Sequence, residues 1–164
     1  MTFSTDTLFV CEHAGVYRCA TAAEITSAAL KQIQRDLSAL PLMNSPDLVR
    51  HFLQLRIGSL AYEVFFVMFL DPHNRLLAFE EMFRGTLNQT AVYPREVVKR
   101  ALELNAGGVI LSHNHPGGST RPSQADLHLT RTLRDALALV DLTVLDHIIV
   151  STNQFTSLAQ EGLL

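Results

Sequence analysis

The feature that most limits the fold of this chain is a short buried strand that ends in two histidines. The run Gly107–Leu111 is apolar and begins with two glycines, a pattern typical of an interior β-strand. His113 and His115 follow two positions apart, and alternate residues of a strand point to the same side. The sequence therefore predicts two imidazole groups side by side at the end of this strand, with Asn114 pointing elsewhere.

A helix that begins after Ser123 adds a carboxylate to these histidines. Ser123 is a favourable N-cap residue, and Asp126 lies in the first turn that follows it. Asp126 shares one helix face with an apolar stripe formed by Leu129, Leu133, Leu137 and Val140. A carboxylate that faces the core is costly unless it is paired or bound to a cation. Two imidazoles and one carboxylate suit zinc, with a fourth position open for water.

Each of these residues has an ordinary structural interpretation when it is considered alone. A single buried histidine is usually a hydrogen-bonded core residue, and a Ser-x-x-Asp pair usually caps a helix. The combination is more specific, because His-x-His is followed by a Pro-Gly-Gly turn and, after seven intervening residues, by Ser-x-x-Asp. The whole pattern favours a metal site at His113, His115 and Asp126.

This pattern resembles the JAMM motif of the JAB/MPN metalloproteases. Further segments extend the resemblance to the bacterial RadC-like proteins: Phe83–Asn88, Pro94–Lys99, Ser112–Gly118 and Val144–His147. The resemblance covers about residues 45 to 164. Full-length members of that family carry an N-terminal helix-hairpin-helix region associated with DNA binding, and this chain is similar to the short form that lacks it.

The resemblance implies a three-layer α/β/α sandwich with a mixed, curved sheet, the architecture that the JAB/MPN domains share with the cytidine deaminases. The alternation of predicted strands and helices favours an α/β fold independently. Deaminases require a His-x-Glu motif and a Pro-Cys-x-x-Cys motif. The sequence contains neither, which excludes base deamination.

The remaining segments predict an N-terminal helical extension, residues 1–44, and a RadC-like JAB/MPN domain, residues 45–164. Within the extension, an alanine-rich helix is expected from about Ala22 to Leu40, stopped by Pro41. Within the domain, the expected elements are a helix to about Ile57, an antiparallel hairpin over 63–70 and 75–83, a helix over 94–104 and a strand over 143–150.

A general base is expected on the hairpin. From the residues alone, Glu63 and the pair Glu80 and Glu81 are equally good candidates. In the resembling family, a glutamate near the start of the equivalent strand contacts the metal-bound water, which favours Glu63. The family serine that matches Ser123 donates to the developing oxyanion, whereas the ordinary role of a serine at this position is helix capping.

These residues predict a zinc-dependent metallopeptidase or isopeptidase that acts on an unidentified peptide or protein. Bound zinc lowers the pKa of its water towards ~7 and polarises a carbonyl group. A nearby carboxylate can take the water proton and pass it to the leaving amine. The alternative, suggested by the family name, is a DNA-repair or mobile-element accessory protein with a structural or vestigial metal site.

The charge balance does not support a nucleic-acid partner. The chain carries 13 Lys and Arg residues against 16 Asp and Glu residues, a net charge of −3. Phosphate binding needs clustered positive charge, and the basic residues are spread along the chain apart from one modest cluster formed by Arg95, Lys99 and Arg100.

Other features concern the location and assembly of the chain. The apolar run Val64–Leu70 is far shorter than the ~20 residues of a spanning helix, and no secretory signal opens the sequence, so we expect a cytoplasmic protein without membrane contact. Cys11 and Cys19 are expected to be free thiols. A homodimer through a sheet edge or the N-terminal helix stays open.

Overall fold

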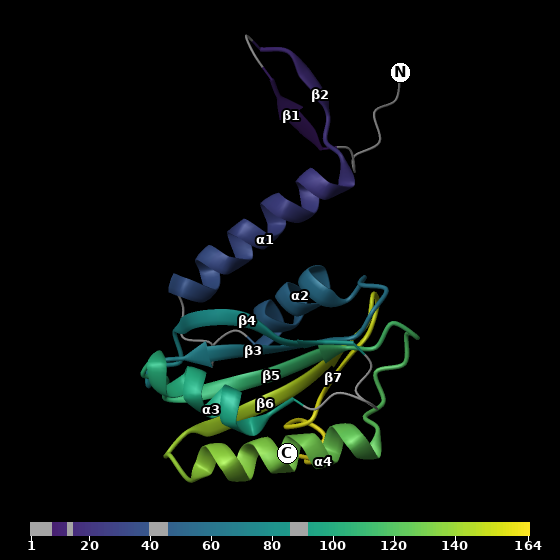
Figure 1. Ribbon diagram of the computed structural model, residues 1–164. Coiled ribbons are helices and arrows are strands. Elements are labelled where there is room, and N and C mark those ends of the chain that lie inside the picture. The colour runs from purple at the N-terminus through teal and green to yellow at the C-terminus, as the bar shows by residue number, and fades with distance from the viewer. Residues whose placement is uncertain (1–7, 13–14, 40–45, 86–91) are drawn as a thin grey trace.

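A mixed β-sheet forms the centre of the computed structural model, which describes residues 8–12, 15–39, 46–85 and 92–164, with residues 33–39 described by their backbone alone (Figure 1). Within these residues the sheet has five strands in the order β4-β3-β5-β6-β7. Strands β5 and β6 are parallel, and the other neighbours are antiparallel. The strands are β3 (Val64–Leu70), β4 (Leu76–Arg84), β5 (Gly108–Asn114), β6 (Thr143–Val150) and β7 (Phe155–Ser157).

Helices cover both faces of this sheet (Figure 1). Helix α2 (Pro46–Ile57) packs on one face, and α3 (Pro94–Glu103) and α4 (Gln124–Ala138) pack on the other. The predicted three-layer α/β/α architecture is therefore confirmed. The positions of the hairpin strands, of α2 and α3, and of β6 agree with the prediction to within one or two residues.

Strand β3 is buried on both sides because its neighbours β4 and β5 and both helical layers surround it. Phe66 and Met68 belong to the core beneath α2, whereas Phe65 and Phe69 belong to the core beneath α3 and α4. Each such side chain stabilises the fold by roughly 1.5–3 kcal/mol when it is removed from water. A continuous apolar run therefore suits this central position.

The N-terminal part extends away from the sheet (Figure 1). It consists of a short hairpin, β1 (Phe9–Cys11) and β2 (Tyr17–Cys19), and helix α1 (Ala22–Ala39), which contacts α2. The two cysteines are free, as predicted, and both are exposed. The hairpin was not predicted, because strands of three mainly exposed residues leave no burial pattern in a sequence.

Some predicted features lie outside the described residues. They are Pro41, which was expected to stop α1, and residues 86–88 of the family-like segment Phe83–Asn88. None of the helices in the described ranges is both long enough and apolar enough to cross a membrane.

Gly58 lies in the turn that connects α2 to β3. A Cβ atom at this position would lie 2.6 Å from the carbonyl oxygen of Gln54 and 2.7 Å from that of Ser151. Both neighbours are backbone atoms, so no side chain can be accommodated without displacing them. This close approach brings the end of α2 against the end of β6. The carbonyl group of Leu60, two residues further on, accepts a hydrogen bond from Asn114 at the carboxyl end of β5.

Candidate metal centre

The three predicted ligands come together at the carboxyl end of β5. His113 lies in β5, His115 follows its last residue, and Asp126 lies in the first turn of α4. The Nε2 atoms of the two histidines are 3.0 Å apart. Asp126 Oδ1 is 3.3 Å from His113 Nε2, and Asp126 Oδ2 is 3.6 Å from His115 Nε2. One atom from each residue lies within 4.8 Å of the others, so the group could hold a metal ion.

The two carboxylate oxygens of Asp126 have different surroundings. Oδ2 accepts hydrogen bonds from the backbone N–H and the hydroxyl group of Ser123, both at 2.7 Å. Oδ1 is buried and has no hydrogen-bond partner in the described part of the chain. Because a buried polar atom without a partner is costly, this orphaned oxygen, 3.3 Å from Nε2 of His113, fits a cation site.

Electrostatics keep Asp126 in the form that binds metals. Burial alone would raise its pKa, but the imidazole groups of His113 and His115 outweigh this effect and hold the pKa well below the usual range. The carboxylate in turn raises the pKa of His115. The charge of Glu63 contributes to the same shift.

A backbone carbonyl group sets the protonation of His115. The Nδ1 atom of His115 lies 2.8 Å from the carbonyl oxygen of Ser119. A carbonyl oxygen can only accept, so Nδ1–H is the donor and Nε2 keeps its lone pair in the neutral ring. In its neutral form, His115 therefore presents an unprotonated nitrogen to the cluster.

His113 is connected to a second buried histidine. Its Nδ1 atom is 2.8 Å from Nε2 of His147 on β6. The Nδ1 atom of His147 is in turn 2.6 Å from Oγ1 of Thr130 on α4. Thr130 was not found from the sequence, because this contact joins two elements that are distant in the sequence. Burial lowers the pKa of His147 well below its ordinary value, so the ring is neutral.

Asn114 binds the backbone on both sides of Glu63. This side chain is fully buried, and Glu63 immediately precedes β3. The amide oxygen accepts a hydrogen bond from the backbone N–H of Val64 at 2.8 Å. The amide nitrogen donates to the carbonyl oxygens of Leu60, at 3.2 Å, and Tyr62, at 3.0 Å. Asn114 thus points away from the histidines, as predicted, and fixes the segment that carries the candidate base.

The alternative bases on β4 are engaged elsewhere. Glu80 forms an ion pair with Arg100 at 2.7 Å, and Glu81 forms one with Arg84 at 2.8 Å. The arginine in each pair lowers the pKa of its glutamate. Strand β3 also separates β4 from β5. Glu63 immediately precedes β3, the neighbour of β5, and its role as the base stays a prediction.

Ser123 acts as the N-cap of α4. Its hydroxyl oxygen accepts the backbone N–H of Asp126 at 3.1 Å, while the carboxylate of Asp126 accepts both donors of Ser123. This reciprocal arrangement is a capping box. The structural role is thus present, and the role of the hydroxyl group as an oxyanion donor stays a prediction.

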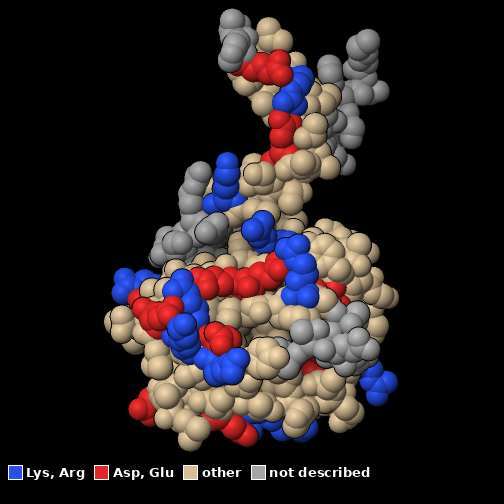
Figure 2. All heavy atoms as spheres, in the orientation of Figure 1, with Lys and Arg blue, Asp and Glu red and all other residues tan. Residues whose placement is uncertain are grey.

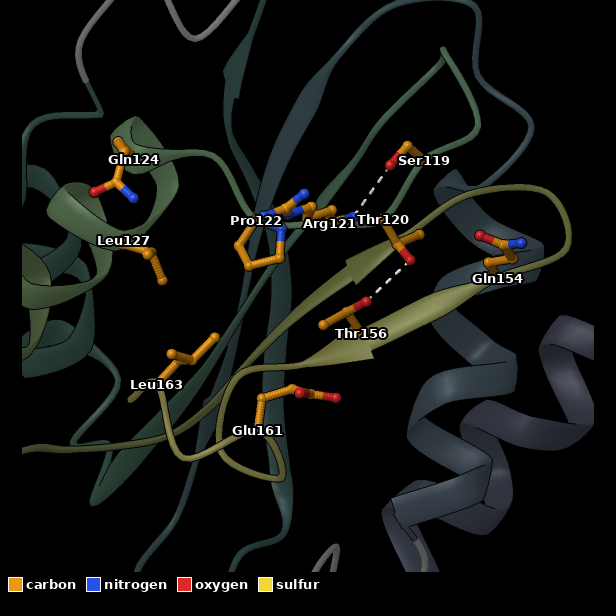
Figure 3. Close-up of a pocket in the computed structure, with 10 residues that line it drawn as sticks. All are labelled: Ser119, Thr120, Arg121, Pro122, Gln124, Leu127, Gln154, Thr156, Glu161 and Leu163. Carbon is orange, nitrogen blue, oxygen red and sulfur yellow. Dashed lines mark hydrogen bonds between the residues drawn. The ribbon is translucent and has the colours of Figure 1, made fainter.

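A polar cavity lies beside the loop that connects β5 to α4 (Figure 3). Its volume is about 550 Å³, and Ser119, whose carbonyl group orients His115, is one of the lining residues. Thr120 and Thr156 hydrogen-bond across it at 2.9 Å. Sequence reasoning missed the cavity because the C-terminal residues that line it, such as Glu161, approach the loop only through the fold.

An α/β/α sandwich with His-x-His at a strand end and an aspartate in the next helix defines a JAB/MPN-type domain with a candidate metal centre. Residues 43–163 match the family described as the RadC-like JAB domain. The chain belongs to this family.

Several related proteins carry the name UPF0758. The UPF0758 protein of Methylibium petroleiphilum is 52% identical over 150 residues, which are 92% of this chain and 68% of that protein. Relatives in Polaromonas sp. and Variovorax paradoxus are 52% and 54% identical over 140 residues, which are 85% of this chain. This chain spans 62% of the length of each of these two relatives.

Proposed function

We propose that this chain is a zinc-dependent hydrolase that cleaves a peptide or isopeptide bond. The observation that carries the proposal is the buried Oδ1 atom of Asp126, which lacks a hydrogen-bond partner among the described residues and lies 3.3 Å from Nε2 of His113, while Oδ2 lies 3.6 Å from Nε2 of His115. Two histidines and one carboxylate match catalytic zinc sites, which keep one position for water or substrate. Membership of the RadC-like JAB family supports the same chemistry.

When bound there, zinc supplies a water of lowered pKa and a Lewis acid for the scissile carbonyl group. Glu63 takes the proton of the attacking water and passes it to the leaving amine. Asn114 holds Glu63 in place through the adjacent backbone. Ser123 donates to the developing oxyanion, for which its hydroxyl group gives up the hydrogen bond to Asp126.

The first test is the zinc content per chain, measured by elemental analysis for the wild type, Asp126→Ala and Glu63→Gln. We expect about one zinc in the wild type and in Glu63→Gln and much less in Asp126→Ala. Cleavage of a mixed peptide library, followed by mass spectrometry, should occur with the wild type alone. An absence of zinc from gently purified wild type contradicts the proposal.

The accessory-protein alternative has weaker support. Each member of the basic cluster on α3 has an acidic neighbour: Arg95 pairs with Glu96, Lys99 with Glu103, and Arg100 with Glu80 and Glu103. Figure 2 likewise shows acidic and basic side chains interleaved on the face in view. Such pairing reduces the positive charge available to phosphates. We therefore propose the hydrolase.

A further inference from the structure

We propose that His147 and Thr130 are positioning residues that set the tautomer of His113 for metal binding. The proposal rests on the metal site of the proposed function, but it does not depend on peptidase activity. It follows from counting the hydrogen atoms available to a chain of hydrogen bonds that runs from α4 through β6 to β5.

The hydroxyl group of Thr130 has a single hydrogen to donate. This hydroxyl group donates to the backbone carbonyl oxygen of Asp126 at 2.6 Å. The same oxygen atom lies 2.6 Å from Nδ1 of His147. Because the hydroxyl hydrogen is already used, Thr130 can only accept in this second contact, and Nδ1 of His147 must carry the hydrogen.

The tautomer of His113 then follows. A neutral His147 with hydrogen on Nδ1 has a lone pair on Nε2, which accepts from Nδ1–H of His113 at 2.8 Å. His113 is left with an unprotonated Nε2, which lies 3.3 Å from the orphaned Oδ1 of Asp126. The Ser119 carbonyl group sets the same state in His115. When both rings are neutral, their Nε2 atoms therefore present lone pairs to one point.

The hydrogen-bond chain is sheltered from solvent and closes on itself. His147 and Thr130 are both 0% exposed. The ring of Phe65 packs edge-on against His147 at 5.6 Å and parallel to His113 at 6.3 Å between centroids. The path begins at the backbone of Asp126 and ends at a nitrogen beside its side chain, so it ties the first turn of α4 to β5. Partners of this kind typically contribute 10–100-fold to metal affinity.

The alternative is that the hydrogen bonds from Thr130 through His147 to His113 run in the opposite direction, and an experiment must exclude it. If Thr130 donated to His147 instead, His147 would donate from Nε2 to His113, and His113 would carry hydrogen on its own Nε2. That arrangement blocks metal binding. The contact between the Thr130 hydroxyl group and the Asp126 carbonyl group therefore determines the direction of the whole chain.

Two substitutions test the proposal, and each has a matched control. Thr130→Val removes the hydroxyl group with little change in volume, and Thr130→Ser retains it. Thr132→Val removes an exposed hydroxyl group on the same helix that makes the same kind of bond, to the carbonyl oxygen of His128 at 2.9 Å. His147→Leu removes the acceptor for His113, whereas His147→Gln keeps an oxygen that can accept.

Zinc affinity, measured for the ion alone by competition with a chelator, should fall about 10–100-fold in Thr130→Val and His147→Leu. Thr130→Ser and Thr132→Val should retain it, and His147→Gln should recover most of it. Long-range ¹⁵N–¹H spectra of the metal-free wild type should show hydrogen on Nδ1 of both His113 and His147. That readout also decides the proposal if no zinc binds. Hydrogen on Nε2 of His113, or unchanged zinc affinity in a folded Thr130→Val, overturns it.

Discussion

The side-chain oxygen of Asn114 accepts the backbone N–H of Val64 at 2.8 Å, although the two residues are 50 positions apart. The bond joins the strand that carries the histidines to the residue that follows Glu63. The central asparagine of the His-Asn-His sequence thus connects the candidate metal centre to the candidate base.

Replacing Asn114 with alanine should destabilise the fold and impair catalysis while leaving zinc bound. The change leaves one buried and two partly buried backbone groups without their partner, and the loss at a buried group typically costs about 1–3 kcal/mol. Urea unfolding measures the stability, and elemental analysis measures the zinc. Loss of zinc from a folded Asn114→Ala would contradict the separation of these two roles.

Replacing Glu63 with glutamine should lower turnover by about 10²–10⁴-fold, the usual contribution of a positioned general base. Zinc content should stay near that of the wild type because Glu63 is not among the three ligands. Glu80→Gln provides the matched control, since Glu80 pairs with Arg100 on another strand. Equal activity in Glu63→Gln and the wild type would contradict the assignment.

Removing the metal should lower the melting temperature of the wild type. Zinc that binds only the folded chain stabilises it by about 2.7 kcal/mol when its free concentration is 100 times the dissociation constant. Asp126→Asn loses the ligand charge, so added zinc or chelator should not shift its melting temperature. Calorimetry with and without chelator makes the comparison, and a zinc-dependent shift in Asp126→Asn would show that the ion binds elsewhere.

Stability should depend on pH through Glu80. The hydrogen bond from Arg100 lowers the pKa of Glu80 below its ordinary value. The folded state therefore binds this proton less readily than the unfolded state. The Arg100–Glu80 pair contributes fully to the free energy of unfolding above the ordinary pKa of glutamate, and this contribution is lost as pH falls through the lower pKa of the folded state. The effect is small because both side chains are about one third exposed, at 32% and 36%. Urea unfolding at a series of pH values should show a weaker acid dependence in Glu80→Gln than in the wild type.

Replacing Gly58 with alanine should destabilise the fold by about 1–3 kcal/mol, as overpacking does elsewhere. The new Cβ atom would lie under 3 Å from two backbone oxygens. Gly117→Ala is the matched control, because a Cβ atom there meets nothing within 4 Å. Equal unfolding free energies for the two variants would contradict the close approach seen at Gly58.

The ligand cluster could be predicted because its determinants are local. Strand alternation places His113 and His115 together, and the capped start of α4 orients Asp126 towards them. The link from Thr130 to His147 could not be predicted, because it depends on how α4 packs against β6. Strand β7 was also missed, since three residues of mixed exposure give no clear alternation of apolar and polar side chains.

The position of Ser119 has a consequence for ligand binding. Its carbonyl group orients His115, and the same residue lines the cavity of about 550 Å³. A molecule that shifts Ser119 when it enters the cavity must also alter the affinity of the ion site. Thermodynamic reciprocity then requires the ion to change the affinity for that molecule by the same factor. If both sites are filled, their occupants are coupled through a single peptide group.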